Sequence, residues 1–215
     1  MFSTLQKEDF QHQMRSSKRV AVYKEFPCDC TTPVKAYQAL AQTYPHSALL
    51  ESSEGTDRYS FIGFAPLCRF QSNGTTIQLT KNETTRTIQA DPIKTLRHLK
   101  NEYLCNISLP SSFMGEAIGF ASYNSVRLFE NIPARHPNTL HFPDLLFNFY
   151  KGGIAFDHKK ELLMISYISS QEEGYDEALE KINTIHKQIQ TFQESTLLND
   201  CAKKEFHVDL DDKAF

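Results

Sequence analysis

Apolar residues recur along this chain at two spacings, and the spacings predict a mixture of strands and helices. Alternating or β-branched runs are typical of strands, and they occur over residues 18–26, 47–52, 59–63, 67–71, 75–80, 85–89, 114–123, 145–150, 153–156 and 161–168. Apolar residues three and four positions apart are typical of helices. This spacing occurs over residues 33–44, 92–103 and 172–192, and a short helix capped by Asn124 is expected at 124–130.

Turn and cap residues support these boundaries. Thr32-Pro33 and Asp91-Pro92 each place a capping side chain before a proline, which is typical of the first turn of a helix. Asn73-Gly74 lies between two alternating runs and predicts a hairpin. The order of elements lacks the strict strand–helix–strand alternation of a parallel sheet. We therefore expect the α+β class, with mostly antiparallel sheets and packed helices.

Composition narrows the class of protein. The chain has 215 residues, 40% hydrophobic and 23% charged, with a formal net charge of −3. This balance is that of a globular domain and differs from the basic stripe of a nucleic-acid-binding protein. Apolar runs such as residues 162–168 are too short to span a bilayer, and residues 1–18 do not resemble a signal peptide. We expect a cytoplasmic protein with neither nucleic-acid nor membrane partners.

Cysteine and histidine give little sign of a metal site. Five cysteines at irregular spacing are unlike a secreted disulfide framework. Cys28 and Cys30 form a C-x-C pair without a second cluster, so reduced loop thiols are favoured over zinc. No two histidines lie four residues apart in a helical stretch. We expect no metal site and no cofactor in this chain.

Leu50, Glu51 and Ser52 form the first candidate site, at the end of an apolar strand. A carboxylate there could hold an ammonium group by a charge-assisted hydrogen bond, and a neighbouring hydroxyl could donate or accept. That combination suits a zwitterionic amino acid. On the residues alone, an ordinary strand end followed by a turn remains the simpler interpretation.

Arg58, Tyr59 and Ser60 open the next strand and form a second, weaker candidate group. Alternation places Tyr59 on one face and Ser60 on the other. Arg58 could bind the carboxylate of a ligand, or it could pair with Glu51 or Asp57. A cross-strand ion pair is the simpler of these alternatives.

Other combinations of polar residues do not make a convincing catalytic site. Arg127 and Glu130 are spaced as a salt bridge on a helix. His141 with Asp144, and Asp157 with His158, could in principle form dyads, but no established catalytic motif surrounds either pair. We therefore predict no catalytic residues in this chain.

Four segments, in this order, resemble the anthranilate synthase component I family, whose members use chorismate in tryptophan biosynthesis. They read LLESSEGTDRYSFIGFAP (49–66), Asp91-Pro92 with its helix, GEAIGFASYNSVRLFENIP (115–133) and PDLLFNFYKGGIAFDH (143–158). Glu116, Phe120 and Asn124 depart from the family pattern, which has Gly, Tyr and Asp there. The RYSFIG spelling favours the tryptophan branch over the related aminodeoxychorismate synthase component I of folate synthesis.

The resemblance implies a large α+β sandwich in which residues 1–192 form the family's N-terminal domain. Residues 193–215 would then be a linker and the start of a C-terminal chorismate-binding domain, although a frayed tail would also fit the pattern. That C-terminal domain would carry catalysis and the magnesium ligands of the full-length enzyme. Leu50, Glu51 and Ser52 would line part of the site for L-tryptophan, the feedback effector.

The implied function is therefore regulatory and structural, without catalysis by this chain alone. The implied partners are the C-terminal domain and a glutamine amidotransferase subunit that delivers ammonia. Two alternatives remain open at this point. One is the same portion of aminodeoxychorismate synthase component I, and the other is a stand-alone amino-acid-binding module or remnant.

Overall fold

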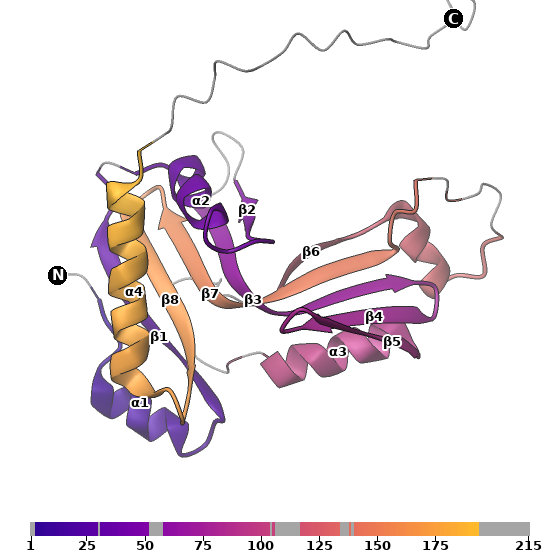
Figure 1. Ribbon diagram of the computed structural model, residues 1–215, viewed down its shortest axis with the longest axis horizontal. Helices are drawn as coiled ribbons and strands as arrows, with labels where there is room; N and C mark the ends of the chain where they lie inside the picture. Colours follow the sequence, from indigo (N-terminus) through magenta and orange to yellow (C-terminus); the bar gives the residue numbers. More distant parts are fainter. Residues whose placement is uncertain are drawn as a thin grey trace, which may run out of the picture.

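The computed structural model describes residues 3–29, 31–51, 58–103, 105, 117–133, 138 and 140–193 of the 215. Helices and strands are intermixed along the chain (Figure 1). In chain order they are α1 Lys7–Met14, β1 Arg19–Pro27, α2 Pro33–Ala41, β2 Ala48–Leu50, β3 Tyr59–Asn73, β4 Thr76–Lys81, β5 Thr84–Gln89, α3 Pro92–Tyr103, β6 Ala117–Ala121, the 3-10 helix η1 Tyr123–Leu128, β7 Leu145–Asp157, β8 Leu162–Ser170 and α4 Gly174–Thr191.

All the described strands belong to one antiparallel sheet. Its central order is β1-β8-β7-β3-β4-β5, with β2 paired to β3 and β6 paired to β7. The strands β3 and β7 are long and pair along most of their length, so they run through both halves of the molecule (Figure 1). The predicted α+β class with mostly antiparallel pairing is confirmed.

Two hydrophobic clusters lie on opposite faces of this sheet. The first packs α1, α2 and α4 against one half and includes Ile154 and Phe156 of β7. The second packs α3 against the other half and includes Leu145 and Phe149 of the same strand. Because side chains alternate along a strand, these even- and odd-numbered residues point to opposite faces. Each half of the sheet is therefore covered by helices on a different side.

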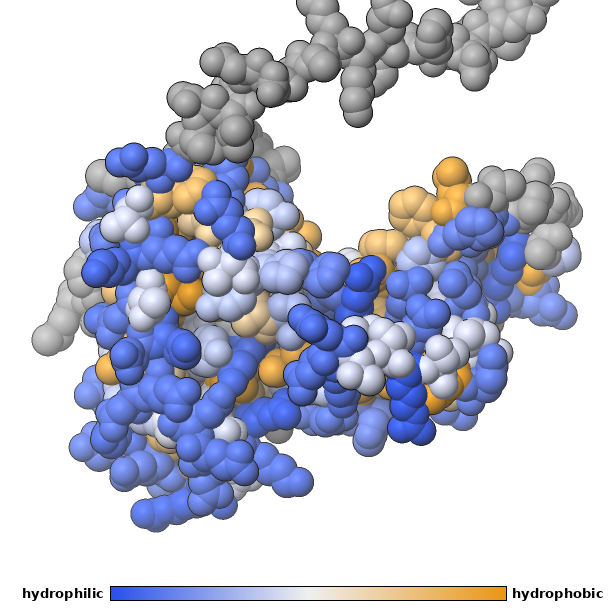
Figure 2. Space-filling view, in the orientation of Figure 1, coloured by the Kyte–Doolittle hydropathy of each residue, from blue (hydrophilic) through white to orange (hydrophobic). Residues whose placement is uncertain are grey.

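The hollow between the two halves is visible on the surface in Figure 2. Apolar side chains gather on the arm that carries β6 and η1. The exposed ones there are Phe120, Tyr123, Phe129, Ile132, Leu140 and Phe142. Within the part of the chain that the structure describes, no helix is long and apolar enough to cross a membrane.

Most predicted elements are present, with corrections to their bounds. The pairs 59–63 with 67–71, and 145–150 with 153–156, are each one continuous strand, and β3 changes register between Pro66 and Cys68. The sequence pattern breaks at that bulge and at Gly152-Gly153, whereas backbone pairing continues. The second helix ends at Ala41, and α4 begins at Gly174.

Of the predicted helix caps, two are present and one is wrong. Thr32 accepts a hydrogen bond from the backbone N–H of Lys35, and Asp91 accepts one from Lys94, as predicted. The short helix is a 3-10 helix that begins at Tyr123, so the prediction that Asn124 caps it is wrong. The helix α1 was not predicted, because its sequence KEDFQHQM buries only Phe10 and carries almost no apolar periodicity.

Candidate functional site

The described parts of the LLES and RYSFIG segments contribute to two neighbouring strands, β2 and β3. Ala48 pairs with Gly63, Leu49 with Ile62, and Leu50 with Phe61. Register partners in an antiparallel pair share a face, so Leu50 lies beside Phe61. The two motifs therefore form one local unit.

Two of the three residues expected at the effector site, Leu50 and Glu51, lie within the described part of the chain. Leu50 exposes 50% of its surface, a large fraction for a leucine. Glu51 follows it and is exposed. Ser52 lies outside the described residues. An exposed apolar side chain next to a carboxylate can bind a ligand that has both an apolar body and an ammonium group.

Arg58 is held by a carboxylate that the sequence analysis considered with His158 and not with Arg58. Its Nε donates to Oδ1 of Asp157 at 2.9 Å, and its Nη2 pairs with Oδ2 of the same side chain. Tyr59 is the register partner of Asp157 on β7. The simpler interpretation, a cross-strand ion pair, holds, with Asp157 as the partner. Asp57, one of the two partners considered from the sequence, lies outside the described residues.

The electrostatics of this pair follow from its contacts. Partial burial by itself would raise the pKa of Asp157, but the net pKa is lowered because Arg58 and the backbone N–H groups of Lys159 and Lys160 stabilise the carboxylate. The hydrogen bond to Asp157 in turn raises the pKa of Arg58. A guanidinium engaged at two points is poorly placed to bind the carboxylate of a ligand as well.

Tyr59 and Ser60 point in different directions, as alternation predicts. The Arg58 guanidinium lies 4.9 Å from the centre of the Tyr59 ring, and that ring stacks on Phe61 with centroids 5.8 Å apart. Ser60 is fully buried, and its hydroxyl lies 2.8 Å from Nε2 of His158. A serine and a histidine in contact can suggest a nucleophile and base, but Ser60 has no exposed surface and is not among the residues that line the cavity between the two halves of the sheet. We assign this contact to structure.

Tyr150 was missed by sequence reasoning, although it ties this region together. Its ring lies so close to Gly63 that a Cβ there would be 2.4 Å from Cδ2 of the tyrosine. The Tyr150 hydroxyl donates to the carbonyl of His46 at 2.8 Å, just before β2 begins. The glycine of RYSFIG is therefore required by a ring on the neighbouring strand. A glycine within an apolar strand was the available signal for such a close approach.

The described residues do not fit a magnesium site. No three or more of their His, Cys, Asp and Glu side chains are grouped so that they could hold a metal ion. We therefore assign no magnesium ligand to the described residues.

Comparison with known proteins identifies the family. The sequence pattern of the family described as "chorismate binding enzyme" matches residues 24–215. This chain belongs to the chorismate binding enzyme family. The match covers both strands of the LLES–RYSFIG unit and both halves of the sheet, so the family assignment applies to the region described above.

Individual relatives carry related names. The chain is 30% identical over 191 residues to the probable anthranilate synthase component 1 of Schizosaccharomyces pombe, covering 83% of this chain and 36% of that protein. It is 28% identical over 155 residues to aminodeoxychorismate synthase component 1 of Bacillus subtilis, covering 70% of this chain and 32% of that protein. The chain thus spans about a third of the length of these relatives.

A solved structure supports the fold. Anthranilate synthase component I from Streptococcus pneumoniae superposes with a TM-score of 0.53 at 24% identity, covering 77% of this chain and 36% of that one. The fold of this chain is therefore that of an anthranilate synthase component I-like region.

Proposed function

We propose that this chain acts as the N-terminal regulatory and structural portion of an anthranilate synthase component I, carries part of its tryptophan feedback site, and does not catalyse alone. The observation that carries the proposal is the paired LLES–RYSFIG unit within a chain of the chorismate binding enzyme family. In the whole protein, chorismate would be converted to anthranilate by a C-terminal domain. A glutamine amidotransferase subunit would supply the ammonia.

The local geometry supports the recognition of an amino acid. Glu51 offers an exposed carboxylate for the ammonium group, and the half-exposed Leu50 offers apolar contact for a side chain. Arg58 is occupied by Asp157. The ligand's carboxylate would therefore be held by other groups, including those of the C-terminal domain.

Feedback would follow from a site shared between two parts of the protein. Tryptophan would stabilise one relative arrangement of those parts, and that arrangement would bind chorismate less well. The same coupling free energy would act in both directions, so chorismate would weaken tryptophan binding by an equal factor.

Tryptophan binding tests the effector part of the proposal. The chain contains no tryptophan, so indole fluorescence excited near 295 nm would report the ligand alone. We expect binding by the wild type and at least about a tenfold loss in Glu51→Ala, because a lost charge-assisted hydrogen bond is worth about 1.5–3 kcal/mol. Ser52→Ala should also weaken binding.

Glu172→Ala is a matched control, because Glu172 is exposed and lies on the turn before α4. It should bind tryptophan as the wild type does. Equal affinity in Glu51→Ala and Glu172→Ala would remove Glu51 from the site.

Catalysis is tested separately. The chain, incubated with chorismate, ammonium and magnesium, should form no anthranilate, which is detected by its own fluorescence. Anthranilate formation above the uncatalysed rate would overturn the division of roles that we propose.

The folate-branch relative supplies the second candidate function. Similarity to an aminodeoxychorismate synthase component 1 at 28% is close to the 30% of the tryptophan branch. The two are separated by the product that the complete enzyme makes from chorismate, since the scaffold is shared. Aminodeoxychorismate without anthranilate would assign the chain to the folate branch.

A further inference from the structure

A second possible binding site lies in the hollow between the two halves of the sheet. It is a cavity of about 690 Å³, a size typical of small-molecule pockets. Its walls come from the connection between α2 and β2 and from β3, β4, β5 and β7. None of Leu50, Glu51, Arg58, Tyr59 and Ser60 lines it.

Two polar side chains in this cavity each have one buried atom without a hydrogen-bond partner among the described residues. Arg69 on β3 and Asn148 on β7 both line it and are register partners, so they lie side by side on one face. The buried Nε of Arg69 and the buried Oδ1 of Asn148 have no hydrogen-bond partner among the described residues. Asn148 is only 8% exposed. A buried donor or acceptor without a partner costs about 1–3 kcal/mol, and a ligand that supplied both partners would recover it.

The orientation of the Asn148 amide is fixed by Tyr150. The Tyr150 hydroxyl has one proton, which it donates to the carbonyl of His46 at 2.8 Å. It can therefore only accept from Asn148, whose Nδ2 lies 3.2 Å away. The amide nitrogen thus faces Tyr150, which leaves Oδ1 as an acceptor without a partner.

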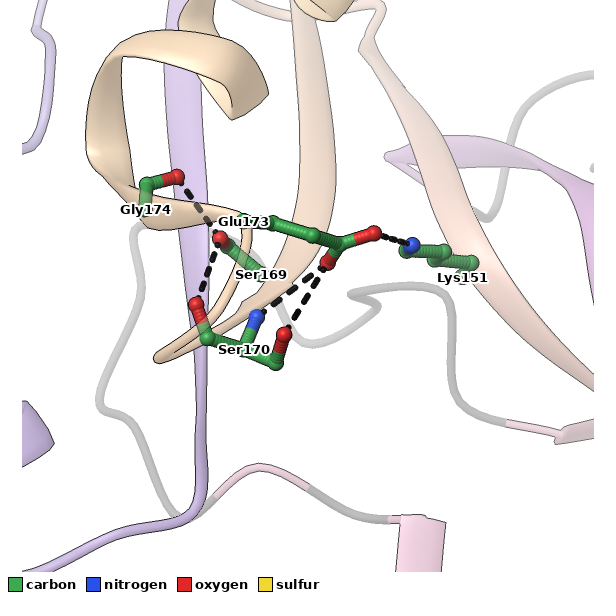
Figure 3. Close-up of polar contacts among 5 residues, drawn as sticks. All are labelled: Lys151, Ser169, Ser170, Glu173 and Gly174. Atoms are coloured by element: carbon green, nitrogen blue, oxygen red, sulfur yellow. Dashed lines mark hydrogen bonds and ion pairs between the residues drawn. The ribbon is translucent and has the colours of Figure 1, made fainter.

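The other cation of the cavity is already neutralised. Lys151 pairs with Glu173, and that carboxylate also accepts from the backbone N–H of Ser170 at 3.3 Å (Figure 3). Arg69, in contrast, forms no ion pair with any residue the structure describes. Glu83 is the remaining charged group in the lining, and it is exposed. The cavity therefore presents one half-buried guanidinium without a counter-ion.

We propose that this cavity binds a small carboxylate that carries a neighbouring hydroxyl and an apolar body. The carboxylate would accept from Nε of Arg69, and the hydroxyl would donate to Oδ1 of Asn148. Tyr44, Pro45, Pro66 and Leu67 line the cavity and provide apolar contact. A net anion fits better than a zwitterion, because Glu173 already neutralises Lys151 and leaves Arg69 to be balanced.

This inference does not rest on the tryptophan assignment, and 3-phenyllactate tests it. This probe has the carboxylate, the neighbouring hydroxyl and an apolar ring. Two probes each lack one group: 2-phenylethanol lacks the carboxylate, and 3-phenylpropanoate lacks the hydroxyl. L-phenylalanine replaces the hydroxyl by an ammonium group. Binding to the full chain is measured by calorimetry, and the Nε–Hε signals of arginine are followed by NMR.

We expect 3-phenyllactate to bind most tightly and to shift the Nε–Hε signal of Arg69. Arg69→Gln should weaken its binding at least about tenfold, and should leave any binding of 2-phenylethanol unchanged. Arg86→Gln is the matched control, because Arg86 lies on β5, is not among the residues that line the cavity, and is exposed. It should bind all four probes as the wild type does.

The proposal is overturned if 3-phenyllactate does not bind, or if it binds without shifting the Arg69 signal. It is also overturned if Arg69→Gln and Arg86→Gln bind the probe equally well. Circular dichroism of both variants shows whether they are folded. If Arg69→Gln is unfolded, the NMR shift in the wild type decides the question.

Discussion

Two arginines eleven positions apart illustrate two regions of this molecule. Arg58, just before β3, is exposed and is held at two points by Asp157 on the neighbouring strand. Arg69, within β3, is half-buried and has a buried Nε without a partner. Arg58 therefore has a counter-ion, Asp157, whereas Arg69 lies in a cavity and has no counter-ion among the residues that the structure describes.

The difference separates a residue that stabilises from a residue available for binding. Arg58 lies in the segment that carries the family resemblance, yet its charge is used in connecting β3 to β7. Arg69 lies outside the most distinctive motif, yet its unmet hydrogen bond favours a ligand. The family resemblance therefore draws attention to the start of β3, whereas the buried atom without a hydrogen-bond partner draws attention to Arg69, farther along that strand.

The largest effect is expected at Gly63, between these two regions. A Cβ at Gly63 would lie 2.4 Å from the Tyr150 ring, so we expect Gly63→Ala to lower the free energy of unfolding by about 3 kcal/mol. The ring would have to move, and the hydrogen bonds that orient Asn148 would be lost with it. Urea denaturation measures the first effect, and 3-phenyllactate binding measures the second.

Gly74→Ala provides the comparison for that variant. Nothing lies within 4 Å of a Cβ there, but the positive φ of 54° is unfavourable for alanine, so a cost of about 1 kcal/mol is expected. A loss in Gly63→Ala no greater than that in Gly74→Ala would show that Tyr150 does not pack against Gly63 as described.

A smaller effect is expected when the paired arginine loses its partner. Asp157→Asn should lower the free energy of unfolding at pH 7 by about 1 kcal/mol, since the pair is partly open to solvent. Asn retains an acceptor for the turn of Lys159 and Lys160, so the change isolates the charge. Thermal unfolding at low and high salt measures it, and the difference from wild type should shrink at high salt.

The pH dependence of that pair has a defined direction. The pKa of Asp157 is lower in the folded protein than in the unfolded chain. Its stabilisation is therefore complete above the unfolded pKa, about 3.9, and is lost as the pH falls through the folded pKa. Asp157→Asn should show a shallower loss of stability below pH 4 than the wild type. Parallel profiles would contradict this assignment.

The smallest expected effect is a change in the free energy of unfolding that has opposite signs when Arg69 and Arg58 are each replaced by methionine. Arg69→Met removes a half-buried cation that has no counter-ion in the described part of the chain, and should raise the free energy of unfolding by about 0.5–1 kcal/mol. Arg58→Met removes the partner of Asp157 and should lower stability. Chemical denaturation of both variants measures the pair of changes. A loss of stability in both would show that Arg69 has a partner in solution.

Much of the fold could be predicted from local signals. The caps at Thr32 and Asp91 and the turn at Asn73-Gly74 are signalled by residues close together in the sequence, and all three are present. Continuity of β3 and β7 was missed because Pro66 and the glycines of β7 interrupt the apolar pattern. Pairing with a neighbouring strand, which is a long-range property, maintains both strands through these interruptions.

The candidate site was predictable only in part, for the same physical reason. The pairing of Leu50 with Phe61 follows from a hairpin, which is local. The partner of Arg58 is 99 positions away, and the contact between Ser60 and His158 spans 98. Arg69 was not a candidate, since an absent partner becomes visible only when the surrounding strands are in place.

The most direct test of the account is a chemical-shift map of the full chain at saturating tryptophan. We predict shifts for the backbone amides of Leu50, Glu51 and Phe61, with the Nε–Hε signal of Arg69 unchanged. Such a map would show that the effector binds at the end of β2 and that the cavity is a separate site. Shifts confined to Arg69 and Asn148, or no shifts, would contradict the assignment of tryptophan to Leu50 and Glu51.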